Sequence, residues 1–170
     1  MRQEHLLPFE LHGANRTPSA VAASYMTSSD EAAMNHRDVP DKANKAAKAV
    51  LDAAFWVHTR TGPGLLERAY RLALVERLRK DGHDVRMEVM MDLSLDDVHV
   101  DNAFRVDLVV DGCVIVELKA VQEVLEVHLS QLSTYLRLGG IPVGLLINFN
   151  VPRLRKGIYR RVYTGAAGRP

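Results

Sequence analysis

Three charged side chains interrupt an apolar stretch near the middle of the chain, "RVDLVVDGCVIVELKA", which runs from Arg105 to Ala120. The stretch is typical of two β-strands joined at Gly112, yet Asp107, Glu117 and Lys119 fall inside those strands. Ionised groups are costly to bury in a sheet unless they are paired or bind a metal. The three groups are therefore candidates for a site that binds a cation.

The length of the turn decides whether the two carboxylates face the same way. A two-residue turn at Asp111-Gly112 would place Asp107 and Glu117 on opposite faces of the sheet. A three-residue turn that also includes Cys113 would pair Asp107 directly with Glu117. We expect the three-residue turn, because it gathers both acids on one face.

The paired register is chemically sensible if a cation lies between the acids, because like charges directly opposite each other destabilise a sheet. Carboxylate oxygens suit hard cations such as Mg²⁺ or Mn²⁺. Lys119, two residues after Glu117, would orient the water that attacks a phosphodiester. The same spacing also fits an ordinary Glu–Lys pair on an exposed sheet face, so spacing alone leaves both interpretations open.

The elements around this hairpin predict one α/β domain. The chain has 170 residues, 47% of them hydrophobic, and a formal net charge of +1, so only a local patch could attract a polyanion. The patterns lie, in chain order, at 41–62 (helix), 65–82 (helix), 85–96, 104–110 and 113–121 (strands), 123–140 (helix), 143–150 and 157–163 (strands). We expect a mixed central sheet flanked by helices, with 157–163 at its edge. In the second helix, we expect the buried stripe to include Leu65, Leu66, Ala69 and Leu72.

The rest of the composition excludes several classes of site. The single cysteine, Cys113, excludes an intramolecular disulfide and a four-cysteine metal site, and it fits a reducing interior. No apolar run approaches the length of a membrane span, and we expect a cytoplasmic protein. We also expect a disordered tail at 1–40, a folded domain at 41–164 and a flexible end at 165–170. Met34 is an alternative start within that tail.

Three further motifs extend the pattern: "GPGLLERAY" at 62–70, "QLSTYL" at 131–136 and "VGLLINF" at 143–149. With the hairpin, they resemble the GxxExxY protein family, which belongs to the PD-(D/E)XK nuclease superfamily. The resemblance covers the chain from about Ala46 to Val162. It implies a restriction-endonuclease-like core in the order α-β-β-β-α-β and a metal-dependent phosphodiesterase site. The implied cofactor is Mg²⁺ (or Mn²⁺), and the implied partner is nucleic acid, with DNA preferred to RNA.

The resemblance also assigns roles to residues by position. It implies that Glu67, Asp107 and Glu117 are catalytic acids that hold the metal, and that Lys119 is the catalytic lysine that positions the water. Val106 stands where the superfamily pattern often has proline. The acids and the lysine are all present, so no departure marks the site as inactive.

Four residues are candidates for a supporting role. Gln131 and Tyr135 resemble the Q-x-x-x-Y helix that lies beside the site in exonuclease domains of the superfamily. Tyr70 could bond to a site carboxylate or pack against the hairpin. His58 matches a Val-His dipeptide of the family and could lie near the site, or it could be a satisfied, half-buried histidine.

Two basic groups are candidates for binding phosphates. Arg68 and Arg71 follow Glu67 on the second helix, and a second group follows the last buried strand. That second group consists of Arg153, Arg155 and Lys156. A solvated face is the alternative interpretation for both groups.

The function we expect is metal-dependent hydrolysis of nucleic-acid phosphodiester bonds. A non-catalytic module that binds nucleic acid or protein on the same fold is the first alternative. The second is a purely structural domain that forms a homodimer; it predicts neither metal binding nor salt-dependent binding to nucleic acid.

Overall fold

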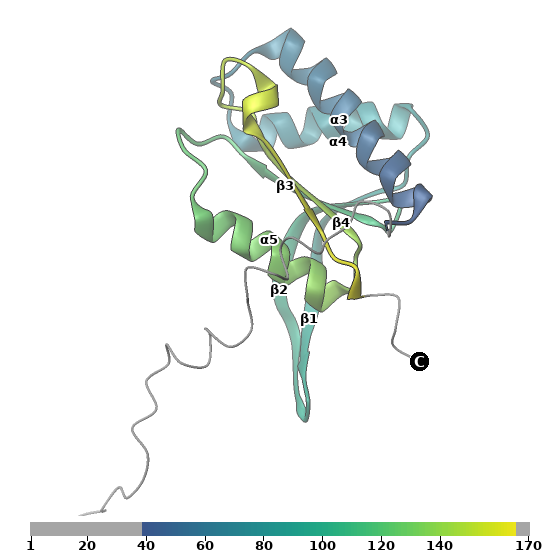
Figure 1. The fold of residues 1–170 in the computed structure, drawn as a ribbon. Coiled ribbons are helices and arrows are strands. Elements are labelled where there is room, and N and C mark those ends of the chain that lie inside the picture. The colour runs from purple at the N-terminus through teal and green to yellow at the C-terminus, as the bar shows by residue number, and fades with distance from the viewer. Residues whose placement is uncertain (1–38, 166–170) are drawn as a thin grey trace, which may run out of the picture. The chain divides into compact units, whose positions relative to one another are not determined.

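The computed structural model describes residues 39–165. The predicted tail, the alternative start at Met34 and the predicted flexible end therefore lie outside the described residues, apart from residues 39, 40 and 165. The elements are, in chain order, α3 (Asp41–Thr61), α4 (Glu67–Lys80), β1 (Val85–Leu95), β2 (Val98–Val110), β3 (Val114–Lys119), α5 (Glu126–Gly139), β4 (Val143–Asn148), the 3₁₀ helix η2 (Leu154–Gly157) and β5 (Ile158–Val162) (Figure 1).

The five strands form one mixed sheet in the order β1-β2-β3-β4-β5. Neighbouring strands are antiparallel except β3 and β4, which are parallel and are joined through α5. This arrangement confirms the predicted mixed sheet, the predicted α-β-β-β-α-β order from α4 to β4, and the placement of β5 at an edge. None of the helices in the described part of the chain is long and apolar enough to cross a membrane.

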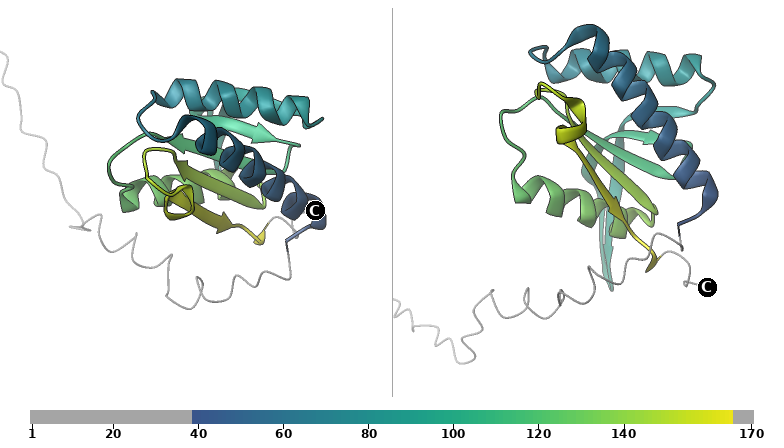
Figure 2. Two further views of the ribbon diagram at one scale, coloured as in Figure 1. Left: turned by 90° about the horizontal axis from the view of Figure 1, so that it is seen from above. Right: turned by 45° about the horizontal axis from the view of Figure 1, so that its top comes forward.

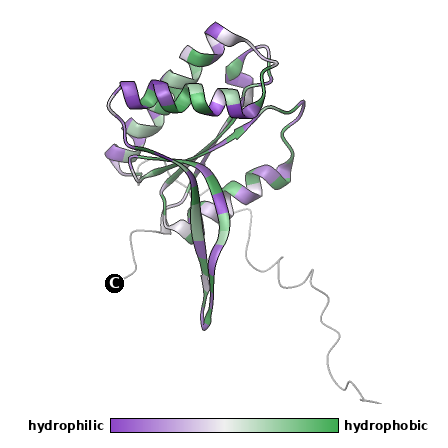
Figure 3. Ribbon diagram, turned by 180° about the vertical axis from the view of Figure 1, so that it is seen from behind, coloured by the Kyte–Doolittle hydropathy of each residue, from purple (hydrophilic) through white to green (hydrophobic). Residues whose placement is uncertain are grey.

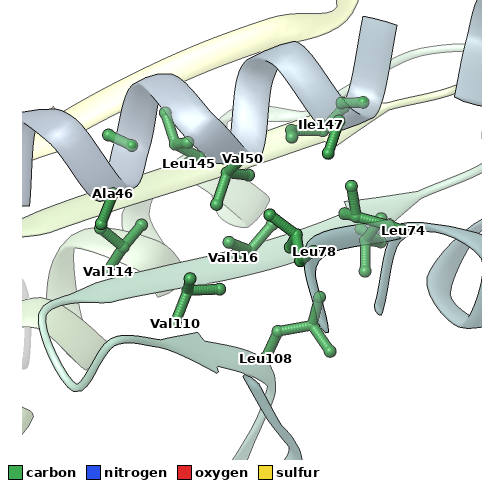
Figure 4. Close-up of a cluster of buried hydrophobic side chains, with 14 of the residues drawn as sticks. Ala46, Val50, Leu74, Leu78, Leu108, Val110, Val114, Val116, Leu145 and Ile147 are labelled. Atoms are coloured by element: carbon green, nitrogen blue, oxygen red, sulfur yellow. The ribbon is translucent and has the colours of Figure 1, made fainter. Parts of the chain in front are cut away.

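Helices cover both faces of the sheet (Figure 2). On one face, α3 and α4 pack against β3 and β4, and Figure 4 shows this larger cluster of buried side chains, with Val50 and Leu78 opposite Val116 and Leu145. On the other face, α5 packs Leu132 and neighbouring residues against the sheet in a second cluster. The two clusters are called here the α3/α4 face and the α5 face.

The buried stripe of α4 differs from the prediction. Leu66 is 81% exposed and Leu72 is 43% exposed, whereas Tyr70, Leu74 and Leu78 are fully buried. The helix begins only at Glu67, so Leu65 and Leu66 lie in the preceding loop. Residues four apart share one helix face, so Tyr70, Leu74 and Leu78 form one apolar stripe. Tyr70 is the largest apolar side chain of α4, and its burial turns this stripe, and not the one that contains Leu72, toward the sheet.

The β1–β2 hairpin is longer than predicted, because β2 begins at Val98 and not near residue 104. Figure 3 shows its far end projecting beyond the helices. Nearer the sheet, the hairpin twists sharply. Leu108 packs on the α3/α4 face, whereas Val106, two residues earlier, packs on the α5 face. Glu88 on β1, with a left-handed φ of 50°, lies at the same level. Asp107 therefore sits where the hairpin turns from one face of the sheet to the other.

Candidate active site

The turn between β2 and β3 has the predicted three residues, 111–113. Leu108 pairs with Val116, and this register places Asp107 opposite Glu117. The alternative two-residue turn is thereby excluded. The two carboxylates that the sequence suggested as neighbours are adjacent in the sheet.

Beyond the Leu108–Val116 pair, carboxylates replace the regular ladder of backbone hydrogen bonds. The backbone N–H of Leu118 donates to Oδ2 of Asp107 at 2.9 Å, and the N–H of Asp107 donates to Oε1 of Glu117 at 3.4 Å. The side chains thus lie in a gap between β2 and β3, called here the fork. A carboxylate held by backbone donors is fixed in orientation, so the fork presents oxygens in a set direction.

Glu117 is the most deeply buried acid of the fork, with 6% of its surface exposed. Burial, the negative charge of Asp107 and, to a lesser degree, that of Glu67 raise the pKa of Glu117 to about 7. Lys119 opposes this rise, since its Nζ lies 3.7 Å from Oε2 of Glu117. A divalent cation bound here would offset the free-energy cost of burying an ionised Glu117 beside Asp107.

Glu67 approaches the fork from the first position of α4. Its negative charge there suits the helix dipole, and its effect on the pKa of Glu117 places it in the same electrostatic neighbourhood. Among the described residues, however, Glu67, Asp107 and Glu117 are not a set whose ligand atoms all lie within 4.8 Å of one another. The structure brings Asp107 and Glu117 together, whereas no hydrogen bond or ion pair among the described residues joins Glu67 to either of them.

Tyr70 fixes the loop that leads to Glu67. Its hydroxyl donates to the carbonyl of Gly62 at 2.7 Å and accepts the N–H of Leu65 at 3.0 Å. Its ring stacks on Phe149 with centroids 4.5 Å apart. Among the described residues, Tyr70 makes no hydrogen bond to a site carboxylate. It is buried in the same cluster as Leu108 and Leu118 of the β2–β3 hairpin, and it positions the start of α4.

His58 holds the loop that follows β4, and Asn148, the last residue of β4, holds the loop that follows β3. His58 is buried, and its Nε2 donates to the carbonyl of Val151 at 2.8 Å, which matches the interpretation of a satisfied histidine. Asn148 donates to the carbonyl of Val121 at 2.9 Å and accepts its N–H at 3.2 Å. Asn148 therefore fixes the chain just after Lys119. Sequence reasoning missed it, although a polar residue at the end of the apolar run "VGLLIN" was a usable signal.

Gln131 and Tyr135 share one face of α5, as predicted. The side-chain amide of Gln131 donates to the hydroxyl of Tyr135, whose ring stacks on Phe104 of β2 with centroids 4.5 Å apart. In the described part of the chain, no hydrogen bond or ion pair joins either residue to the acids or the lysine of the fork. Tyr135 belongs to the core of the α5 face, and Gln131 is exposed beside it.

The basic residues divide into two kinds. Arg71 contacts the fork directly, since its Nη1 donates to Oδ1 of Asp107 at 3.0 Å. This contact was not predicted, because it depends on the rotation of α4 over the twisted hairpin. The others predicted to bind phosphate are exposed. They are Arg68, Arg153, Arg155 and Lys156, and Arg155 borders a cavity of about 460 Å³ with Leu51, Phe55 and Ile158.

A second group of ligand-type side chains lies on the projecting hairpin. The ligand atoms of Asp92, His99 and Asp101 lie within 4.8 Å of one another, and all three residues are exposed. Nε2 of His99 is 3.0 Å from Oδ1 of Asp101. The register of β1 and β2 shifts between Met91 and Leu93, beside Asp92 of this group.

The residues of the fork fit a divalent cation by their chemistry. They offer carboxylate oxygens, the ligands that Mg²⁺ and Mn²⁺ prefer. Burial and the charge of Asp107 raise the pKa of Glu117, and a divalent cation would offset that cost. Comparison with known proteins gives one family. Residues 44–162 match the model described as the PD-(D/E)XK nuclease superfamily. No curated protein and no solved structure matches the chain.

Proposed function

The chain belongs to the PD-(D/E)XK nuclease superfamily, and on that premise we propose that it is a metal-dependent nuclease that hydrolyses nucleic-acid phosphodiester bonds. The observation that carries the proposal is the fork, where Asp107 and Glu117 lie side by side with Lys119 adjacent. We also place the chain in the GxxExxY branch, on Gly64, Glu67 and Tyr70.

Asp107 and Glu117 would hold the Mg²⁺ or Mn²⁺ ion, with Glu67 completing the acidic set. The bound ion would lower the pKa of a water molecule and neutralise charge on the phosphate. Lys119 lies beside Glu117 and is only 20% exposed, so it can donate a hydrogen bond that orients the attacking water. The backbone N–H of Leu118 keeps Asp107 in place during this step.

DNA is the substrate that we propose in preference to RNA. Arg68, beside Glu67, would hold phosphates near the fork, and Arg153, Arg155 and Lys156 would extend the contact. Gln131 and Tyr135 would support the substrate strand from α5. We propose a cytoplasmic location because a single free cysteine fits a reducing interior. That the chain forms a homodimer stays a prediction.

Cleavage of single- and double-stranded DNA in Mg²⁺ and Mn²⁺ tests the proposal. Glu117→Ala and Lys119→Ala should each reduce the rate by about a hundredfold or more. Glu123→Ala, which removes an exposed acid before α5, should leave the rate unchanged. Circular dichroism would confirm that every variant is folded. Cleavage that survives both changes would show that the fork is not the active site, and binding without cleavage would favour the non-catalytic alternative.

A further inference from the structure

We propose that Arg71 couples metal binding to substrate binding in the fork, an inference that rests on the proposed function. Without substrate, its guanidinium is the counter-charge of Asp107 and weakens the hold on the metal. With substrate, the guanidinium transfers to a phosphate and the metal is held more tightly. The prediction made from sequence treated Arg71 only as a phosphate ligand.

The ion pair between Arg71 and Asp107 is well shielded from solvent. Nη1 of Arg71 is 3.0 Å from Oδ1 of Asp107, and the two side chains are 16% and 15% exposed. A pair of this kind is screened less by water and salt than an exposed one. Arg71 therefore neutralises a large part of the charge that a metal would use.

Both oxygens of Asp107 already have a donor. Oδ1 accepts from Arg71, and Oδ2 accepts from the N–H of Leu118. Each carboxylate oxygen keeps a second lone pair, so a divalent cation can still coordinate. It would then lie roughly 4–5 Å from a guanidinium held at hydrogen-bond distance from the same carboxylate, where repulsion between cations remains strong.

Binding of a phosphodiester would remove this repulsion between the guanidinium of Arg71 and the metal ion. The planar guanidinium matches phosphate oxygens in a two-point contact. Among residues 39–165, the second partner of Arg71 is Glu88, whose Oε1 lies at a looser 3.6 Å. Glu88 is half-exposed and is also shared with Arg105 at 3.7 Å. Movement of Arg71 to substrate would leave Asp107 to the metal. By linkage, metal and nucleic acid would then raise each other's affinity by the same factor.

Isothermal titration of the full chain with Mn²⁺ tests the coupling, with and without a DNA oligonucleotide whose phosphorothioate linkages resist hydrolysis. Without DNA, Arg71→Gln should bind Mn²⁺ about tenfold more tightly than the wild type. With DNA, the wild type should gain affinity for Mn²⁺, whereas Arg71→Gln should gain little. Arg71→Lys, which keeps the charge, should resemble the wild type without DNA. Lys80→Gln removes a charge from the exposed end of α4 and should change nothing.

An Arg71→Gln variant that is folded and binds Mn²⁺ equally or more weakly than the wild type would overturn the coupling, because Arg71 would then only position Asp107. Glu117→Gln separates this failure from failure of the proposed function. If the wild type and Glu117→Gln bind Mn²⁺ alike, the fork is not the metal site, and both proposals fall. If Glu117→Gln loses Mn²⁺ but Arg71→Gln is unchanged, only the coupling is wrong.

Discussion

Glu117 carries the main electrostatic cost among the residues of the fork. Its pKa of about 7, against an ordinary 4.5, means that the folded protein binds the proton more tightly than the unfolded chain does. Stability from this group is therefore complete below about pH 4.5 and is lost as the pH rises through about 7. Burial of the carboxyl group is the largest cause of this pH dependence, and the charge of Asp107 adds to it.

Glu117→Gln should consequently stabilise the metal-free protein at high pH. The rise in pKa from 4.5 to about 7 corresponds to an upper value of about 3 kcal/mol above pH 7, and the difference should vanish near pH 4. Urea unfolding in EDTA at both pH values measures it. Glu123→Gln, at an exposed site, is the control. A variant that is less stable than the wild type at high pH would contradict the electrostatic account.

Residue types and spacing predicted the acids of the fork but not all of their partners. Asp107 and Glu117 could be paired because strand alternation and turn length fix the register. Arg71 and Glu88 could not be paired with them, because their contacts depend on a sharp twist at Glu88 and on how α4 is rotated. No local pattern in the sequence encodes the twist of the hairpin or the rotation of α4 about its axis.

Among the elements, the β2–β3 turn and the start of α4 set the geometry of the fork. Asp111 and Gly112 adopt left-handed φ angles of 51° and 67°, a conformation that glycine favours and aspartate tolerates. Cys113 completes the turn, and burial raises the pKa of its thiol, so it stays protonated. The two left-handed residues of the turn thus fix the register of β2 and β3.

Tyr70→Phe tests how the loop before α4 is held. Loss of the hydroxyl leaves the carbonyl of Gly62 and the N–H of Leu65 without their partner, and should cost about 1–3 kcal/mol. Chemical denaturation measures the loss, and Mn²⁺ titration should show weaker binding because Glu67 is less well placed. Tyr159→Phe, on half-buried β5, is the matched control and should be nearly neutral. An equal loss in both variants would mean that the hydroxyl of Tyr70 has no special role.

The pattern predicted the type and order of the elements better than their buried faces. The strand between 85 and 96 was found because it alternates, although much of its far end faces solvent. The stripe of α4 was placed wrongly, because Leu66 and Leu72 are as apolar as the residues that are buried. Composition alone cannot choose between two apolar stripes; packing of Tyr70 against Phe149 does.

At the scale of the whole domain, the fork lies in a sheet that helices cover on both faces. α4 brings Arg71 into contact with Asp107 of the fork, while α5 packs on the opposite face of the same sheet. At Asp107, where the hairpin twists, side-chain carboxylates take the place of backbone hydrogen bonds between β2 and β3. The chain therefore forms its acidic site from segments that are far apart in sequence, on a sheet held by two separate clusters.

The most direct test of the central claim is the position of Mn²⁺ in crystals grown or soaked with the ion, located by its anomalous scattering. We expect a peak in the fork, about 2.2 Å from carboxylate oxygens of Asp107 and Glu117, with Glu67 turned toward it directly or through water. The same peak should disappear in Glu117→Gln crystals. Mn²⁺ found only at Asp92, His99 and Asp101, with none in the fork, would contradict it.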